Sequence, residues 1–252
     1  MIQIKSKAEI AIMHESGKRL SKVMEELHKA VRPGISTLEL DAIAYETIKK
    51  LDGIPSFKGY GGFPGSVCAS VNDEVVHGIP SKDVILQEGD IVGLDIGLIY
   101  KGFHSDMART FAVGQISKED QRLIDVTRQS FWDGLEYAKI GNRLGDISHA
   151  IQQTAEAAGY SVVRELCGHG IGRNLHEDPE VPNFGKSGRG PRLVDGLVIA
   201  IEPMINQGRK EVYVLDDDWT VVTADGKKSA HYENTVAITE NGPMPLTNFE
   251  VK

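Results

Sequence analysis

The 252-residue sequence has little that would support a disulfide framework, a membrane span or secretion. Its only two cysteines, Cys68 and Cys167, form no C-x-x-C motif, which is typical of a reduced intracellular protein. The longest apolar stretch, residues 91–100, contains Asp95 and is too short to cross a bilayer. The first residues contain no apolar core of a secretory signal. We therefore expect a cytoplasmic protein that does not associate with membranes.

Basic clusters and several common catalytic motifs are also missing. Acidic residues outnumber basic ones 36 to 28, and no five basic residues follow one another, so nothing indicates binding to nucleic acid. The sequence has no H-E-x-x-H zinc motif, no G-x-S-x-G elbow and no phosphate-binding loop. These absences exclude several classes of hydrolase and NTPase. With 40% hydrophobic and 25% charged residues, the composition is that of a globular protein.

The predicted secondary structure follows the same order twice, helices first and strands after them. Apolar residues at spacings of three and four predict the helices, and short apolar runs predict the strands. The predicted helices cover residues 6–31, 37–51, 117–138 and 145–158. The predicted strands lie near residues 66–71, 90–99, 162–166, 197–202, 211–215 and 232–239.

An offset of 107 residues relates three pairs of residues at matching places in these elements. The pairs are Gly34 and Gly141, Gly89 and Gly196, and Asp95 and Glu202. This regularity favours an internal duplication within a single α+β domain spanning 1–252, with halves of about 5–115 and 116–245. The alternative is coincidence, because units of two helices and strands are common. A duplicated fold would place Asp95 and Glu202 at equivalent points of one cleft.

Asp95 and Asp106 lie on two apolar runs that are joined through Tyr100-Lys101-Gly102, a plausible hairpin turn. Their midpoint falls in this turn, so in a regular hairpin they would face each other with Cβ atoms about 4.5–5.5 Å apart. Like charges so placed destabilise a sheet unless cations bridge them. The alternative is a solvated pair at a sheet edge, but the surrounding run I-V-G-L-D-I-G-L-I is too apolar for an exposed strand.

Three further residues are candidate ligands, although each is a weak signal alone. His169 lies in C-G-H-G-I-G, Glu202 ends the apolar run L-V-I-A-I-E, and Glu233 opens a predicted strand. Four carboxylates and one imidazole are too many charges to bury together without cations, so the five residues form a candidate dinuclear metal site. His104 and His231 each precede a candidate ligand by two positions and are candidate hydrogen-bonding partners for these ligands, the alternative being ordinary polar strand residues.

A series of motifs, spread from about residue 5 to residue 240, resembles those of methionine aminopeptidases of the short, bacterial type I form. In order they are K-A-E-I-A-I-M-H-E-S-G, N-D-E-V-V-H-G-I-P, G-D-I-V-G-L-D-I-G, F-H-S-D-M-A-R-T-F, C-G-H-G-I-G-R, L-H-E-D-P, I-A-I-E-P and Y-E-N-T. The resemblance implies the "pita-bread" fold, in which two pseudo-symmetric halves of helices and strands surround a curved antiparallel sheet.

The resemblance also implies ligands and catalytic roles. It assigns two divalent ions, Co²⁺, Mn²⁺, Fe²⁺ or Zn²⁺, to Asp95, Asp106, His169, Glu202 and Glu233. Glu202 would in addition carry a proton from the attacking water, since a carboxylate near neutral pH can serve as a general base. His77 and His176 match the two active-site histidines of the family that do not bind metal. His176 would donate a hydrogen bond to the developing oxyanion, and His77 would orient the substrate.

The implied substrate is the N-terminal methionine of nascent polypeptides, including chains on the ribosome, with preference for a small second residue. The methionine pocket would be formed, together with His77 and His176, by Phe57, Tyr60, Phe63, Cys68, Leu175 and Trp219. Phe57 and Leu175 stand where the family often has cysteine and phenylalanine. A monomer is expected. The competing interpretations are an Xaa-Pro aminopeptidase or prolidase, and a non-enzymatic binding protein on the same fold.

Overall fold

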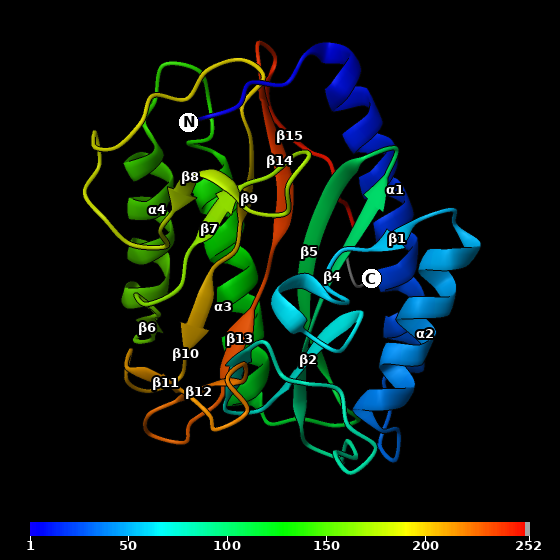
Figure 1. Cartoon of the computed structure of the whole chain (residues 1–252). Coiled ribbons are helices and arrows are strands. Elements are labelled where there is room, and N and C mark those ends of the chain that lie inside the picture. The colour runs from blue at the N-terminus through cyan, green and yellow to red at the C-terminus, as the bar shows by residue number, and fades with distance from the viewer. Residues whose placement is uncertain (250–252) are drawn as a thin grey trace.

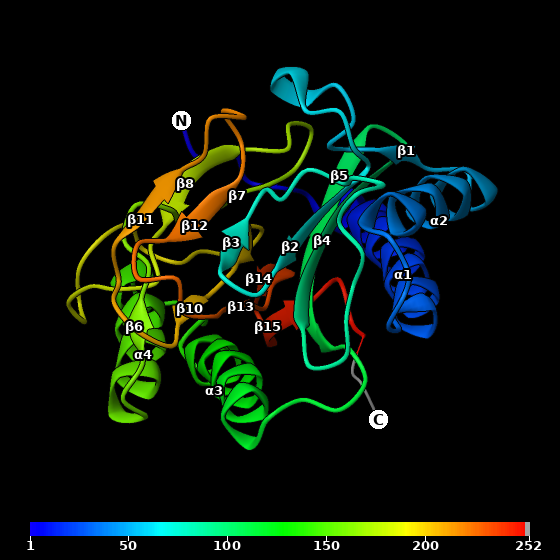
Figure 2. The same cartoon turned by 90° about the horizontal axis from the view of Figure 1, so that it is seen from below.

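The computed structural model describes residues 1–249, in which two pairs of helices cover the outer faces of antiparallel sheets (Figure 1). In the first pair, one helix packs on the hairpin of β4 (Ile91–Tyr100) and β5 (Phe103–Ala112), and the other packs on β2 (Val67–Val71) and β1 (Ile54–Pro55). The second pair packs near β6 (Ser161–Val162), β10 (Met204–Asn206) and β13 (Ser229–His231). Figure 2 shows the two pairs on separate sides of the strands. The helices are α1 (Lys7–Ala30), α2 (Thr37–Lys50), α3 (Lys118–Leu135) and α4 (Leu144–Ala157). The predicted α+β class is confirmed.

Serine residues cap the starts of α1, α2 and α3. The Ser6 side chain accepts a hydrogen bond from the Glu9 backbone, and the Glu9 carboxylate accepts one from the Ser6 backbone. Ser36 and Glu39 form the same reciprocal pair at α2. Such caps satisfy backbone N–H groups that have no partner inside the helix. All four predicted helices are confirmed; α3 ends three residues before its predicted end at position 138.

The strands form four antiparallel groups. The first group has the order β1-β4-β2, with β5 paired to β4; these strands are β1 (Ile54–Pro55), β2 (Val67–Val71), β4 (Ile91–Tyr100) and β5 (Phe103–Ala112). The second has the order β15-β14-β9-β7-β8; these are β7 (Gly168–Gly170), β8 (Glu177–Val181), β9 (Val198–Ile201), β14 (Asn234–Thr239) and β15 (Gly242–Pro245). The two small groups are β13-β10-β6 and β11-β12-β3; these are β3 (Glu74–Val76), β6 (Ser161–Val162), β10 (Met204–Asn206), β11 (Val212–Val214), β12 (Val221–Thr223) and β13 (Ser229–His231).

Most predicted strands exist, but two predictions about them were wrong. The strand predicted over 162–166 stops at Val162, because after a last hydrogen bond from the Val163 N–H to Met204 the chain no longer pairs with β10. Glu233 does not open the strand predicted over 232–239, because β14 begins one residue later, at Asn234. The short strands β7 and β8 carry too few apolar residues to be predicted from the sequence.

Two apolar clusters anchor the helix pairs. Leu20 and Met24 of α1 lie fully buried with Leu94 and Leu98 of β4 in the first cluster. Phe131 and Ile147, from α3 and α4, lie with Ile199 and Val236 of β9 and β14 in the second. Each fully buried side chain of this size stabilises the fold by about 1.5–3 kcal/mol. Both clusters therefore hold a sheet by its outer face and leave its inner face for the site.

The two main sheets meet along a seam between β5 and the segment 231–235. At the centre of this seam, the backbone N–H of Glu233 donates directly to the Ala108 carbonyl at 2.9 Å. On both sides of this bond, a threonine hydroxyl takes the place of a backbone group and bonds both N–H and C=O of the residue opposite. These contacts pair Asp106 with Thr235, Ala108 with Glu233, and Thr110 with His231. The seam fixes Asp106 and Glu233 relative to each other.

Corresponding glycines of the two predicted halves share a backbone conformation. Gly34 and Gly141, each between two helices, have φ of 88° and 96°. Gly89 and Gly196 have φ of 92° and 83°. These angles lie in the left-handed region, which side chains disfavour. The division of the chain into halves of about 5–115 and 116–245 stays a prediction. Among the described residues, no helix is both long and apolar enough to span a bilayer.

Replacement of Gly17 by alanine should destabilise the protein. Gly17 lies in the middle of α1, and a Cβ there would overlap the carbonyl of Leu246. At an open helical position the same change stabilises by roughly 0.5–1 kcal/mol. Here we expect the free energy of unfolding in urea to fall by about 1–3 kcal/mol, the usual cost of overpacking. The exposed neighbour Lys18→Ala should change it by less than about 0.5 kcal/mol; equal or higher stability of Gly17→Ala would contradict the close contact.

Candidate metal centre and substrate pocket

The hairpin of β4 and β5 brings Asp95 and Asp106 to one face, but in a different register from the predicted one. Its turn is Lys101-Gly102, and both residues have a positive φ, 49° and 77°. Asp95 therefore pairs with Ala108 and Asp106 pairs with Gly97, so the prediction that the two aspartates face each other was wrong. Since positions two apart on a strand share a face, the aspartates are diagonal neighbours and still within reach of one another.

Gly97 makes room for the pocket beside these carboxylates. It lies opposite Asp106, and a Cβ at this position would come within 2.7 Å of Ser56 and 2.8 Å of Phe57. No side chain tolerates such distances. The glycine thus lets Phe57, from the segment between β1 and β2, approach the face of β4 that carries Asp95.

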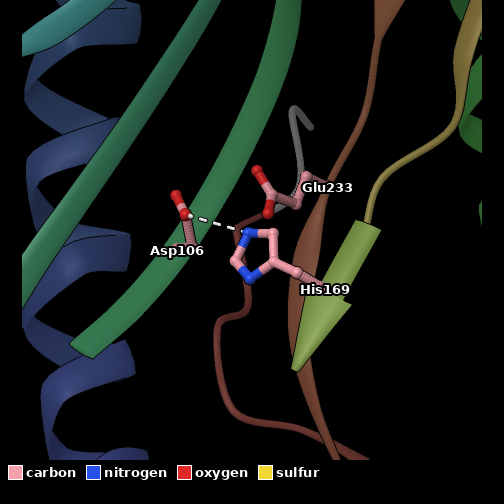
Figure 3. A group of neighbouring side chains, drawn as sticks. All are labelled: Asp106, His169 and Glu233. Atoms are coloured by element: carbon pink, nitrogen blue, oxygen red, sulfur yellow. Dashed lines mark ion pairs between the residues drawn. The ribbon is translucent and has the colours of Figure 1, made fainter. Parts of the chain in front are cut away.

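The second part of the chain supplies the imidazole and two more carboxylates. His169 projects from β7, and its Nε2 lies 3.8 Å from Asp106 Oδ2 and 3.6 Å from Glu202 Oε1. Its Nδ1 lies 2.9 Å from the Gly170 carbonyl, which leaves Nε2 for the carboxylates. Figure 3 shows Asp106, His169 and Glu233 pointing toward one another. One potential ligand atom from each of the three side chains lies within 4.8 Å of the other two. Residues from both main sheets therefore meet at one point.

Burial sets the protonation of the group. It raises the pKa of Asp95 to about 7 and raises the pKa values of Asp106, Glu202 and Glu233 well above the usual range. The neighbouring carboxylates raise the last three further, because like charges repel strongly in an apolar setting. Burial also lowers the pKa of His169 to about 3, so its imidazole is neutral. Neutral imidazole is the form that binds metal.

The donor set fits divalent cations. Asp95 Oδ1, Asp106 Oδ1 and Glu233 Oε1 are buried and have no hydrogen-bonding partner among the residues that the structure describes. Buried oxygens of this kind are costly unless a proton or a cation compensates them. Carboxylates with one imidazole suit Mn²⁺, Fe²⁺ and Co²⁺ and tolerate Zn²⁺. The alternative of a solvated pair of aspartates does not hold for Asp106, which is 4% exposed.

A cavity of about 200 Å³ is lined by all the predicted metal-binding, catalytic and substrate-binding residues. The predicted residues that line it are Phe57, Tyr60, Phe63, Cys68, His77, Asp95, Asp106, His169, Leu175, His176, Glu202, Trp219 and Glu233. The lining residues that the sequence did not point to are Val76, Leu166, Cys167 and Met204. Each of these lies within three positions of a predicted site residue, and this proximity is the signal that would have found them.

Two histidines lie at the wall of the cavity outside the acidic group. His77 has φ of 62°, a conformation that non-glycine residues rarely adopt and that concentrates at functional sites. Its ring stands edge-on to Trp219, with centroids 6.3 Å apart. The centroids of the His176 and His169 rings are 4.2 Å apart. Burial lowers the pKa of both His77 and His176, which favours neutral rings.

The two histidines predicted as partners of the ligands have different environments. His231 Nε2 lies 3.9 Å from Glu202 Oε2, a distance that one bridging water could span. His104 Nδ1 instead bonds the hydroxyl of Ser56 at 2.9 Å. His231 is thus placed beside a predicted ligand, whereas His104 is tied to the segment that carries the pocket.

Without metal, the protein should lose stability as pH rises from 7 to 8. Carboxyl groups with raised pKa hold protons in the folded protein that the unfolded chain has already released, so their contribution is lost as pH passes through the folded pKa. Each such proton lowers the free energy of unfolding by about 1.4 kcal/mol per pH unit, which is about 3–6 °C in Tm for a chain of this size. Mn²⁺ should raise Tm more at pH 8 than at pH 7, because ligands must be deprotonated. Calorimetry measures both effects.

The matched variant is Asp106→Asn, which removes one buried carboxyl group at nearly constant shape. We expect its Tm to fall less between pH 7 and 8 and to respond less to Mn²⁺. A Tm that is independent of pH, or a variant that behaves as the unchanged protein does, would contradict the assignment of these carboxyl groups.

Comparisons with known proteins agree with this geometry. Residues 11–240 match the model of metallopeptidase family M24. A methionine aminopeptidase of Clostridium acetobutylicum is 57% identical over 250 residues, which are 99% of this chain and 100% of that protein. The structure of methionine aminopeptidase from Thermotoga maritima superposes with a TM-score of 0.97 at 45% identity and covers 98% of this chain and 100% of its own. Prolidase from Pyrococcus furiosus gives 0.81 at 25% identity and covers 98% of this chain but 66% of the prolidase. The chain belongs to metallopeptidase family M24, within its methionine aminopeptidase branch.

Proposed function

We propose that the chain removes the N-terminal methionine from peptides and nascent proteins, preferentially when the second residue is small. The observation that carries the proposal is that one cavity joins the group of Asp106, His169 and Glu233 to an apolar recess. An exopeptidase needs both parts, one for the scissile bond and one for the first side chain. The methionine aminopeptidase relatives support the choice of methionine.

Membership of a metallopeptidase family implies that the protein uses divalent metal. We assign two ions, Co²⁺, Mn²⁺, Fe²⁺ or Zn²⁺, to Asp95, Asp106, His169, Glu202 and Glu233. When bound, the ions supply Lewis acidity at the peptide carbonyl and lower the pKa of a nearby water. The free amine of the substrate would lie against the same group, which limits cleavage to the first residue.

Glu202 is the residue best placed to move the proton. Its carboxylate lies beside His169 on one side and His231 on the other, at 3.6 and 3.9 Å. Asn183 holds the Glu202 carbonyl with a hydrogen bond of 3.0 Å, and Pro203 follows directly, so the side chain starts from a fixed backbone. Glu202 would take the proton of the attacking water and pass it to the leaving amine.

His176 and His77 act on the peptide bond from the wall of the cavity. A neutral His176 donates a hydrogen bond to the carbonyl oxygen as negative charge develops on it. His77, held by its backbone and by Trp219, orients the scissile amide and the backbone of the second residue. Neither side chain is in the assigned ligand set.

The apolar part of the cavity suits an unbranched thioether. Phe63 packs edge-on against Trp219 with ring centroids 5.1 Å apart, and Cys68 is buried beside them. Phe57 and Leu175, which depart from the residues often found in the family, both line the cavity and are 7% and 2% exposed. They keep the wall apolar, and methionine adapts well to irregular apolar spaces. The expected partners are nascent chains, including those on the ribosome, met by a monomer in the cytoplasm.

Peptide cleavage distinguishes this function from its competitors. We expect the Mn²⁺-loaded protein to release methionine from Met-Ala-Ser and to leave Ala-Pro-Ala intact, with products separated by chromatography. Cleavage of Ala-Pro-Ala alone would make the chain an Xaa-Pro aminopeptidase, and cleavage of neither peptide would favour a binding protein.

Two substitutions separate catalysis from metal binding. His176→Ala removes the proposed oxyanion donor and should lower kcat by about 100- to 1,000-fold, while Mn²⁺ still raises Tm as in the unchanged protein. Glu202→Ala removes a proposed ligand and proton carrier, so both activity and the Mn²⁺ effect on Tm should decrease. Full peptidase activity of Glu202→Ala would contradict its role.

A further inference from the structure

Tyr60 links two distant loops across the wall of the cavity. Its hydroxyl lies 2.7 Å from Nδ1 of His176, which is 116 residues away in the chain. The rings are 5.3 Å apart and tilted by 50°, so they make a hydrogen bond at their edges and are not stacked. Tyr60 is 44% exposed, and its position is therefore poorly explained by burial of its ring alone.

The backbone on either side of this bond is fixed independently of it. Glu177, next to His176, forms a buried ion pair with Lys5 at 2.6 Å and also accepts the Asn174 N–H at 3.1 Å. The loop that carries Tyr60 closes on itself, because the Gly59 N–H donates to the Phe63 carbonyl and the Phe63 N–H to the Tyr60 carbonyl. These backbone contacts do not determine which nitrogen of the His176 ring carries the proton.

The position of this proton decides whether Nε2 of His176 donates or accepts a hydrogen bond. A neutral imidazole has one N–H donor and one acceptor nitrogen, and the hydrogen bond made by one nitrogen determines the role of the other. If Nδ1 carried the proton, Nε2 would be an acceptor and would repel a developing oxyanion. If Tyr60 donates its O–H to Nδ1, Nε2 carries the proton and is the donor that an oxyanion needs.

We propose that Tyr60 is a positioning residue that donates to Nδ1 of His176 and so keeps the His176 ring oriented, with its proton on Nε2. The proposal rests on the proposed function, since it gives His176 the donor that peptide hydrolysis requires there. Tyr60 thereby acts on the reaction through His176, in addition to lining the cavity.

Tyr60→Phe removes the hydroxyl and keeps the ring. We expect kcat for Met-Ala-Ser to fall roughly 10- to 100-fold, by analogy with the partners that orient metal-binding histidines, with KM changed less than about twofold. Tyr137→Phe is the matched control, because Tyr137 is an exposed tyrosine that follows α3 and lies outside the cavity. It should retain the unchanged rate. An unaltered kcat in Tyr60→Phe, or an effect confined to KM, would overturn the proposal.

A second measurement separates this proposal from the proposed function. ¹⁵N chemical shifts of His176 in the full chain loaded with Zn²⁺, which is diamagnetic, report which nitrogen carries the proton, whether or not the protein cleaves peptides. We expect an unprotonated Nδ1 in the unchanged protein and a mixture of both forms in Tyr60→Phe. A protonated Nδ1 in the unchanged protein, or identical shifts in the variant, would overturn the role of Tyr60. Failure of the unchanged protein to cleave Met-Ala-Ser would instead count against the proposed function.

Discussion

Four carboxyl groups and one imidazole share a single cavity whose other walls are mostly apolar, and the rest of the molecule is organised around that crowding. In such surroundings the repulsion between carboxylates is far stronger than in water, so either protons or cations must accompany them. The same walls that raise the pKa values of Asp106 and Glu233 also form the recess for an apolar side chain. The raised pKa values of the carboxyl groups and the recognition of an apolar side chain therefore both follow from the same apolar walls.

The helices could be predicted because their signals are local. Ser6 with Glu9 and Ser36 with Glu39 mark starts within four residues of sequence, and apolar spacing marks the buried face. The end of α3 was overestimated because Ala138, although buried, belongs to the turn that follows the helix. Strands of two or three residues have no pattern of their own and depend on partners far away in the sequence.

The ligand set could be predicted only in part from local pattern. The apolar run around Asp95 pointed to a buried carboxylate, yet the pairing differs because the two-residue turn is Lys101-Gly102, one position later than a pairing of Asp95 with Asp106 requires. His169 and Glu233 required the family resemblance, since a histidine among glycines is equally typical of an ordinary loop. The bond between Tyr60 and His176 had no sequence signal, because it joins side chains of two separate loops.

The seam between β5 and residues 231–235 has a further consequence. Asp95 and Asp106 precede the connection at residues 113–117, whereas His169, Glu202 and Glu233 follow it. A chain divided in that connection would give two fragments, each with an incomplete set of ligands. Assembly of the set would require the fragments to recombine across this seam, whose contacts include the hydroxyls of Thr110 and Thr235 and the backbone bond that lies between them. The centre is in this sense a property of an internal interface, and the side chains that join the two fragments, Thr110 and Thr235 among them, lie outside the assigned ligand set.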